Sequence, residues 1–155
     1  MAQFFTMLIA MMPISELRGA IPVALGIYHL SIPEAFFYAV VGNILPVFLI
    51  LWLLGPISNF LAKKSKRAEF FFHWLFERTR VKNHHNFKRW GDLALILFVA
   101  IPLPMTGAWS GALAAFIFDI PYWRAISLIF TGVLIAGLIV TLATTGTFSF
   151  LKIIL

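Results

Sequence analysis

Two residues of opposite charge, Glu16 and Arg18, lie in the otherwise uncharged first 33 residues of the chain. A carboxylate can take up and release a proton, and a guanidinium can hold an anionic group in two places. At membrane depth each charge costs about 2.5–3.5 kcal/mol, so it rarely occurs without a partner or a function. Residues i and i+2 point the same way only in extended backbone. We therefore expect Glu16 and Arg18 to face one cavity from an extended break. The structural alternatives are a buried ion pair that only ties helices together and a break at the membrane surface.

A second polar segment, Pro102 to Gly111, carries hydroxyl groups but no charge. Helix N-termini in this segment would offer backbone N–H groups to an anion. Asn43, in a long apolar run, is a further polar candidate, and an interhelical hydrogen bond is its structural alternative. The expected substrate- or ion-binding residues are therefore Glu16, Arg18, Thr106, Asn43 and Ser110.

The sequence offers little for catalysis or metal binding. Ser110 lies in Ala-Trp-Ser-Gly, close to a motif of some membrane proteases, but His29 sits near the end of its helix and is poorly placed as its base. Cysteine is absent, and the remaining histidines match no common metal-ligand spacing: His73, His84 and His85. We therefore expect a protein that is not an enzyme, with no catalytic residues, no bound metal and no cofactor. An intramembrane serine hydrolase is the alternative of another class.

The composition around these residues is that of a membrane protein. Hydrophobic residues make up 61% of the 155 residues and charged residues 12%. A typical soluble domain has about 45–50% apolar and about 25% charged residues. A soluble enzyme of this size would lack the polar surface needed to cover its core.

The positive charge is concentrated in one segment of the chain. Nine of the 12 lysine and arginine residues lie between Pro56 and Leu93, and this segment accounts for the net charge of +6. Beside long apolar runs, such a segment marks the cytoplasmic face rather than a nucleic-acid site. Its aromatic residues 70–76 predict an amphipathic helix that lies in the membrane interface.

Two long uncharged runs, Ala35 to Ala62 and Ala125 to Leu151, exceed the roughly 20 residues of a spanning helix. Each follows two short apolar stretches separated by a break. One of these stretches, Leu93 to Ile101, has nine residues and as a helix reaches only about half of a bilayer core. Each pair of short stretches therefore predicts a re-entrant hairpin, with ordinary proline-kinked helices as the alternative. The residues expected in the breaks are Pro13, Gly19, Pro22, Pro102, Pro104, Gly107 and Gly111.

The parts of the chain before and after the basic segment have the same layout, including an Ile-Pro pair before each long helix. We expect an all-α polytopic membrane protein with one membrane domain, divided into a first repeat (1–56), a basic amphipathic linker (57–92) and a second repeat (93–155). Because a re-entrant hairpin returns to its own side, we expect two inverted repeats, each a re-entrant hairpin plus a transmembrane helix, with both termini outside. Four full spans would instead put the termini and the linker on one side.

Two motifs resemble those of a known family. Glu-x-Arg-Gly-Ala-Ile-Pro (16–22) and Ala-Ile-Pro-Leu-Pro-x-Thr-Gly-Ala-Trp-x-Gly-Ala (100–112) are similar to the motifs of the putative small multidrug export protein family. That family resembles the DedA-type (SNARE-associated, VTT) membrane proteins, which share paired re-entrant hairpins. The resemblance implies movement of polyprenyl-phosphate or phospholipid, often with proton dependence. The chain departs from these patterns at Met105, where the family usually has glycine, and at Ile101 and Gly107, where DedA-type proteins have arginines.

Residues and resemblance together predict a transporter of a bacterial-type inner membrane that exports a small amphipathic solute, with protons as the expected coupling ion. The alternatives are a DedA-like flippase and a scaffold that only binds anionic lipid. The expected partners are the lipid bilayer and either a small molecule or a lipid phosphate. Nucleic acid is not expected, and with so few helices a homodimer is plausible.

Overall fold

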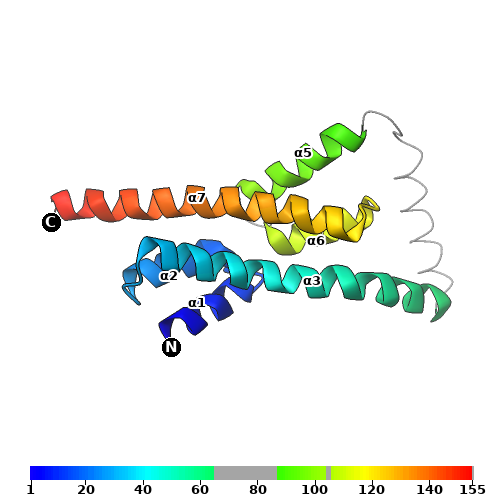
Figure 1. Ribbon diagram of the computed structural model, residues 1–155, viewed down its shortest axis with the longest axis horizontal. Helices are drawn as coiled ribbons and strands as arrows, with labels where there is room; N and C mark the ends of the chain where they lie inside the picture. The colour runs from blue at the N-terminus through cyan, green and yellow to red at the C-terminus, as the bar shows by residue number, and fades with distance from the viewer. Residues whose placement is uncertain (65–86, 104–105, 155) are drawn as a thin grey trace.

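The computed structural model describes residues 1–64, 87–103 and 106–154 (Figure 1). The interfacial helix expected in the linker, the histidines at 73, 84 and 85, and the predicted break residue Pro104 with its neighbour Met105 lie outside the described residues. Within them the chain is all-helical, as predicted. The helices are α1 (Ala2–Met11), α2 (Glu16–Gly26), α3 (Ile32–Lys64), α5 (Phe87–Ala100), α6 (Ala108–Ile117) and α7 (Tyr122–Ile154).

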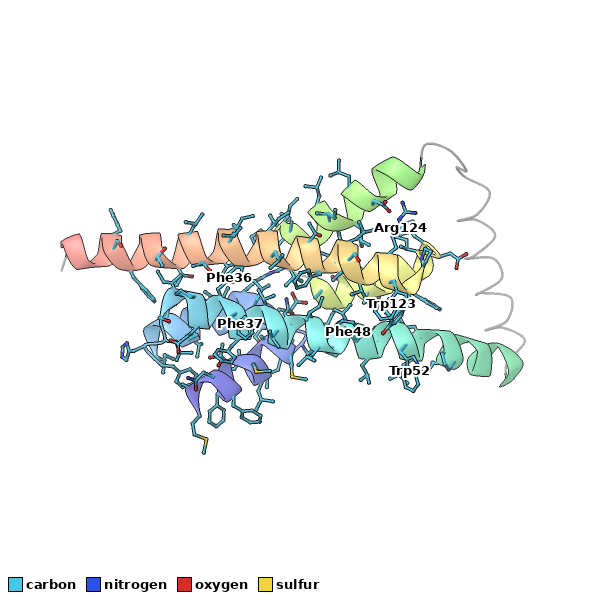
Figure 2. The ribbon with its side chains drawn as sticks, in the orientation of Figure 1. Phe36, Phe37, Phe48, Trp52, Trp123 and Arg124 are labelled. Atoms are coloured by element: carbon cyan, nitrogen blue, oxygen red, sulfur yellow. The ribbon has the colours of Figure 1, made fainter. Side chains whose placement is uncertain are left out.

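The two long helices are long and apolar enough to cross a membrane, over Ile32–Ile57 in α3 and Tyr122–Phe150 in α7. Less than half of each is buried inside the protein, 39% and 44% of its most apolar stretch. Figure 2 shows Phe37 and Trp52 on the outside of α3, where they are 60% and 65% exposed. Large apolar side chains exposed in this number are typical of a surface that faces lipid. The prediction of two candidate spanning helices is confirmed.

The short helices form two hairpins whose turns lie near the middle of the molecule (Figure 1). The first hairpin is α1–α2, beside the start of α3, and the second is α5–α6, beside the start of α7. The two hairpins open toward opposite ends of the molecule (Figure 1). Helices α1, α2 and α6 have 10, 11 and 10 residues. Each is therefore about 15–17 Å long, roughly half of a hydrocarbon core.

The extended break predicted around Glu16 and Arg18 is wrong, because α2 begins at Glu16 and Arg18 is helical. The helix also continues through Pro22, since proline removes only one backbone hydrogen bond from a helix whose other face is packed. Gly19 lies inside α2 and Gly111 inside α6, so neither belongs to a break. The breaks contain Pro13 in the first hairpin, and Pro102 and Gly107 in the second.

The two halves repeat the same backbone features in the same order. A residue with positive φ stands at the start of each second short helix, Glu16 (φ 46°) and Gly107 (φ 137°). Another precedes each long helix, His29 (φ 51°) and Asp119 (φ 54°). Positive φ is uncommon outside glycine, so Glu16, His29 and Asp119 mark places where the chain turns sharply between helices.

Two glycines at matching positions let each long helix approach the first short helix of its own half. A methyl group on Gly42 of α3 would lie 2.5 Å from the backbone oxygen of Met7 in α1. A methyl group on Gly132 of α7 would lie 2.7 Å from Cβ of Val99 in α5. Both distances are too short for any side chain, so these glycines set the spacing between the helices.

Candidate functional site

The breaks of the two hairpins meet through the side chain of Arg18. Its guanidinium donates hydrogen bonds to the backbone carbonyls of Leu103 and Thr106 and, at 3.1 Å, to Oγ1 of Thr106. Carbonyl oxygens left free by the irregular backbone of a break need such donors. Arg18, from the first half, therefore donates to two carbonyls of the second break, and that of Leu103 also accepts from the N–H of Thr106.

Thr106 holds the second break in shape. Its hydroxyl lies 2.7 Å from the carbonyl oxygen of Ile101 and 2.9 Å from that of Leu103, and it also accepts a bond of 3.2 Å from the Leu103 N–H. A single hydroxyl thus joins both ends of the turn to Arg18. The structure places Thr106 within hydrogen-bond distance of Arg18.

Glu16 reaches the same junction at the N-terminus of α6. Its carboxylate accepts a hydrogen bond of 3.4 Å from the Trp109 N–H in the first turn of that helix. Negative charge is favourable there, because the first N–H groups of a helix have no partner within it. A methyl group on Gly107 would lie 2.0 Å from Oε2 of Glu16. Only glycine therefore leaves room for the carboxylate.

Trp109 makes the reverse connection, from the second half to the first. Its indole Nε1 donates a 3.1 Å hydrogen bond to the carbonyl of Met11, the last residue of α1. Sequence reasoning did not count Trp109 among the site residues. Its place in the second polar segment could have identified it. An indole N–H inside a protein requires an acceptor, and here the acceptor is a backbone carbonyl of the other half.

Glu16 is the only charged side chain among the described residues that is buried, with 5% of its surface exposed. It lies outside both candidate spanning helices. Burial raises the pKa of its carboxyl group above the ordinary value, while the Trp109 N–H, the charge of Arg18 and the Ala108 N–H act in the opposite direction. A buried carboxyl group with a raised pKa can exchange a proton closer to neutral pH.

The two charges do not pair directly with each other. A salt bridge is formed instead by Arg124, at the start of α7, with Asp92 in α5. Glu16 and Arg18 do not pair because both belong to α2, and residues i and i+2 of a helix point in different directions. Glu16 and Arg18 instead bind separate groups of the second break, so the ion pair considered as a structural alternative is not formed.

A comparison with family models places residues 16–139 in the family described as putative small multi-drug export protein. The match starts at Glu16 and includes both junction segments and most of α7. The chain belongs to this family. Neither a curated protein nor a solved structure matches the chain. An export family is not an enzyme class.

The two remaining predicted site residues, Ser110 and Asn43, form no hydrogen bond with Glu16 or Arg18 within the described residues. Ser110 donates a 3.3 Å hydrogen bond to the carbonyl of Gly107, within the first turn of α6, and not to His29. Asn43 is buried in α3, 1% exposed, and its Oδ1 accepts no hydrogen bond within the described residues. The junction thus joins Glu16, Arg18 and Thr106, with Ser110 one turn away. Among the described residues no hydrogen bond connects the amide oxygen of Asn43 to them.

Proposed function

We propose that the protein exports a small amphipathic solute, and that the junction of the two breaks is its transport site. The observation that carries this proposal is the position of Glu16. A buried carboxylate from one half lies on a helix N-terminus of the other half, at the point where two oppositely opening hairpins meet. Transporter sites are commonly built in this way from interrupted helices.

Glu16 carries the coupling in this proposal. When it is ionised it stays on the α6 N-terminus, and when it takes up a proton it loses the charge that holds it there. A cationic group of the solute and a proton then compete for the same carboxylate. Arg18 and Thr106 hold the break closed until this exchange occurs, while Ser110 and the unsatisfied amide oxygen of Asn43 offer further polar contacts.

The proposed topology follows from the half-length helices. Each hairpin enters the membrane and returns, each long helix crosses once, and the two repeats are inverted. The +6 charge of the chain, carried by the linker, supports a cytoplasmic position of that linker at a bacterial-type inner membrane, with both termini outside.

Single cysteines test this topology cleanly, because the chain has no cysteine of its own. In Ala2→Cys and Ile154→Cys a membrane-impermeant reagent added outside should label the protein, whereas Glu77→Cys should stay protected. Labelling of Glu77→Cys alone would reverse the orientation, and protection of all three would support four full spans.

A transport assay in vesicles tests the function itself. Wild-type protein should accelerate the efflux of a cationic dye, and a pH gradient should increase the rate further. The Arg18 guanidinium favours an anion as the alternative cargo, but it already donates to the carbonyls of Leu103 and Thr106. Translocation of a lipid phosphate without dye efflux would replace the proposal by a DedA-like flippase.

A further inference from the structure

The end of α1 packs against α3 beside a buried amide group that lacks a hydrogen-bond donor. A methyl group on Gly42 of α3 would lie 2.9 Å from Cβ of Ala10, so the two helices touch there. Asn43 follows Gly42 and is 1% exposed, and no hydrogen bond from the described residues reaches its Oδ1. A buried amide oxygen without a donor is unfavourable, because it has given up its hydrogen bond to water.

Two prolines remove backbone donors from the same contact. Pro46 lies inside α3, four residues after Gly42, and has no N–H for the Gly42 carbonyl. Pro13, three residues after Ala10, has no N–H either. Hydrogen bonds within the described residues reach the carbonyls on both sides of Ala10, but not that of Ala10 itself. Two backbone carbonyls and the Asn43 amide oxygen therefore lack their usual donors at this contact.

The corresponding contact of the second half has neither the asparagine nor the proline. Gly132 of α7 makes the close approach there, with 2.7 Å between an added methyl group and Cβ of Val99 in α5. Val133 follows this glycine, and Ala136 stands four residues after it. Close packing of a long helix on a short one therefore requires neither residue type. The asparagine and the proline of the first half serve something other than packing.

Buried oxygens without donors are suited to a cation. Carbonyls at the C-terminal ends of interrupted helices commonly hold Na⁺ in transporters, and the negative end of the α1 dipole lies at this contact. A water molecule donates only two hydrogen bonds, fewer than the three oxygens present. Divalent cations are usually held by carboxylates. Helix α1 has none, and the acidic residue of α3 lies in its first turn, so a monovalent cation fits better.

We propose that the contact between the end of α1 and α3 binds a monovalent metal cation. Its protein ligands are Oδ1 of Asn43 and the carbonyl oxygens of Ala10 and Gly42. The cation supplies the positive charge that these three oxygens lack, and it ties the first hairpin to the first long helix. The site does not depend on which solute the protein exports.

Thermal unfolding in detergent tests the site without solute and without a pH gradient. The full chain is measured at one pH and one ionic strength in NaCl, in KCl and in N-methylglucamine chloride. A bound cation stabilises the folded state by mass action. The melting temperature should therefore rise by several degrees, and then level off, as Na⁺ or K⁺ replaces the organic cation. Equal melting temperatures in all three salts would overturn the proposal and leave water at these oxygens.

Variants locate the cation within the protein. Asn43→Val should abolish the rise, whereas Thr144→Val, at another buried position whose hydroxyl is already paired, should keep it. If Asn43→Val does not fold, Pro46→Ala replaces it, because it returns an N–H to the carbonyl of Gly42 and should weaken the rise. An undiminished rise in the folded variant would overturn the proposal. So would loss of the rise in Glu16→Gln, because the cation would then belong to the junction.

Discussion

The carboxylate of Glu16 occupies the space that the missing side chain of Gly107 leaves free. A Cβ atom on Gly107 would lie 2.0 Å from Oε2 and 2.7 Å from Cδ of Glu16. The two residues come from different halves of the chain, and Gly107 directly precedes α6. The fit between them therefore fixes how the two hairpins meet.

Gly107→Ala should destabilise the protein strongly. The methyl group would collide with the carboxylate, and alanine at φ 137° is strained by about 1–3 kcal/mol. Gly146→Ala is the matched control, because nothing lies within 4 Å of the added methyl group there. We expect a lower melting temperature in detergent for Gly107→Ala alone. Equal melting temperatures of the two variants would show that the carboxylate does not need this space.

The stability of the protein should fall as pH rises, in a way that depends on Glu16. Because the pKa of Glu16 is raised in the folded state, its contribution is present below the ordinary carboxyl pKa and is lost as pH rises through the folded value. Glu16→Gln keeps the shape but cannot titrate. Between about pH 4 and about pH 8 its melting temperature should therefore change less than that of the wild type. Parallel curves would contradict the raised pKa.

Thr106→Val should lower stability by about 1–3 kcal/mol, because it removes a hydroxyl that binds both ends of the second break and Arg18. Thr147→Val makes the same change at an exposed position, where the hydroxyl donates only to the carbonyl of Ala143. Thermal unfolding of both variants gives the comparison. A loss as small as that of the control would mean that the break keeps its shape without Thr106.

Trp109→Phe should cost about 1 kcal/mol, since the ring stays but the indole N–H no longer reaches the carbonyl of Met11. Trp52→Phe, at a site that is 65% exposed, serves as its control. Hydrogen exchange of the α1 amides provides a local readout. Faster exchange at the end of α1 is expected only in Trp109→Phe, and unchanged exchange would argue against this link between the halves.

Apolar runs and their interruptions were enough to predict the main helices. The two long helices, the short helices α1 and α6, and the breaks at Pro13 and Pro102 all follow from hydropathy and proline positions. The extent of α2 was not predicted. Proline normally ends a helix, and the sequence alone does not show that packing lets α2 continue past Pro22. Local signals give an element its type, and tertiary contacts decide where it ends.

The candidate site was predictable in its residues but not in its bonds. A carboxylate and a guanidinium in an apolar segment indicate a special position, so Glu16 and Arg18 could be named. Their partners are backbone groups of Leu103, Thr106 and Trp109, and every residue has such groups. Sequence patterns do not mark backbone acceptors, so the separation of the two charges became visible only in the fold.

The proton dependence of transport tests the role of Glu16 most directly. Wild-type protein and Glu16→Gln are reconstituted in vesicles at equal amounts, and dye efflux is measured with and without a pH gradient. We predict that the gradient accelerates efflux by the wild type and has no effect on Glu16→Gln, which folds and inserts normally. Acceleration of equal size in both proteins would contradict the proposal that Glu16 carries the proton.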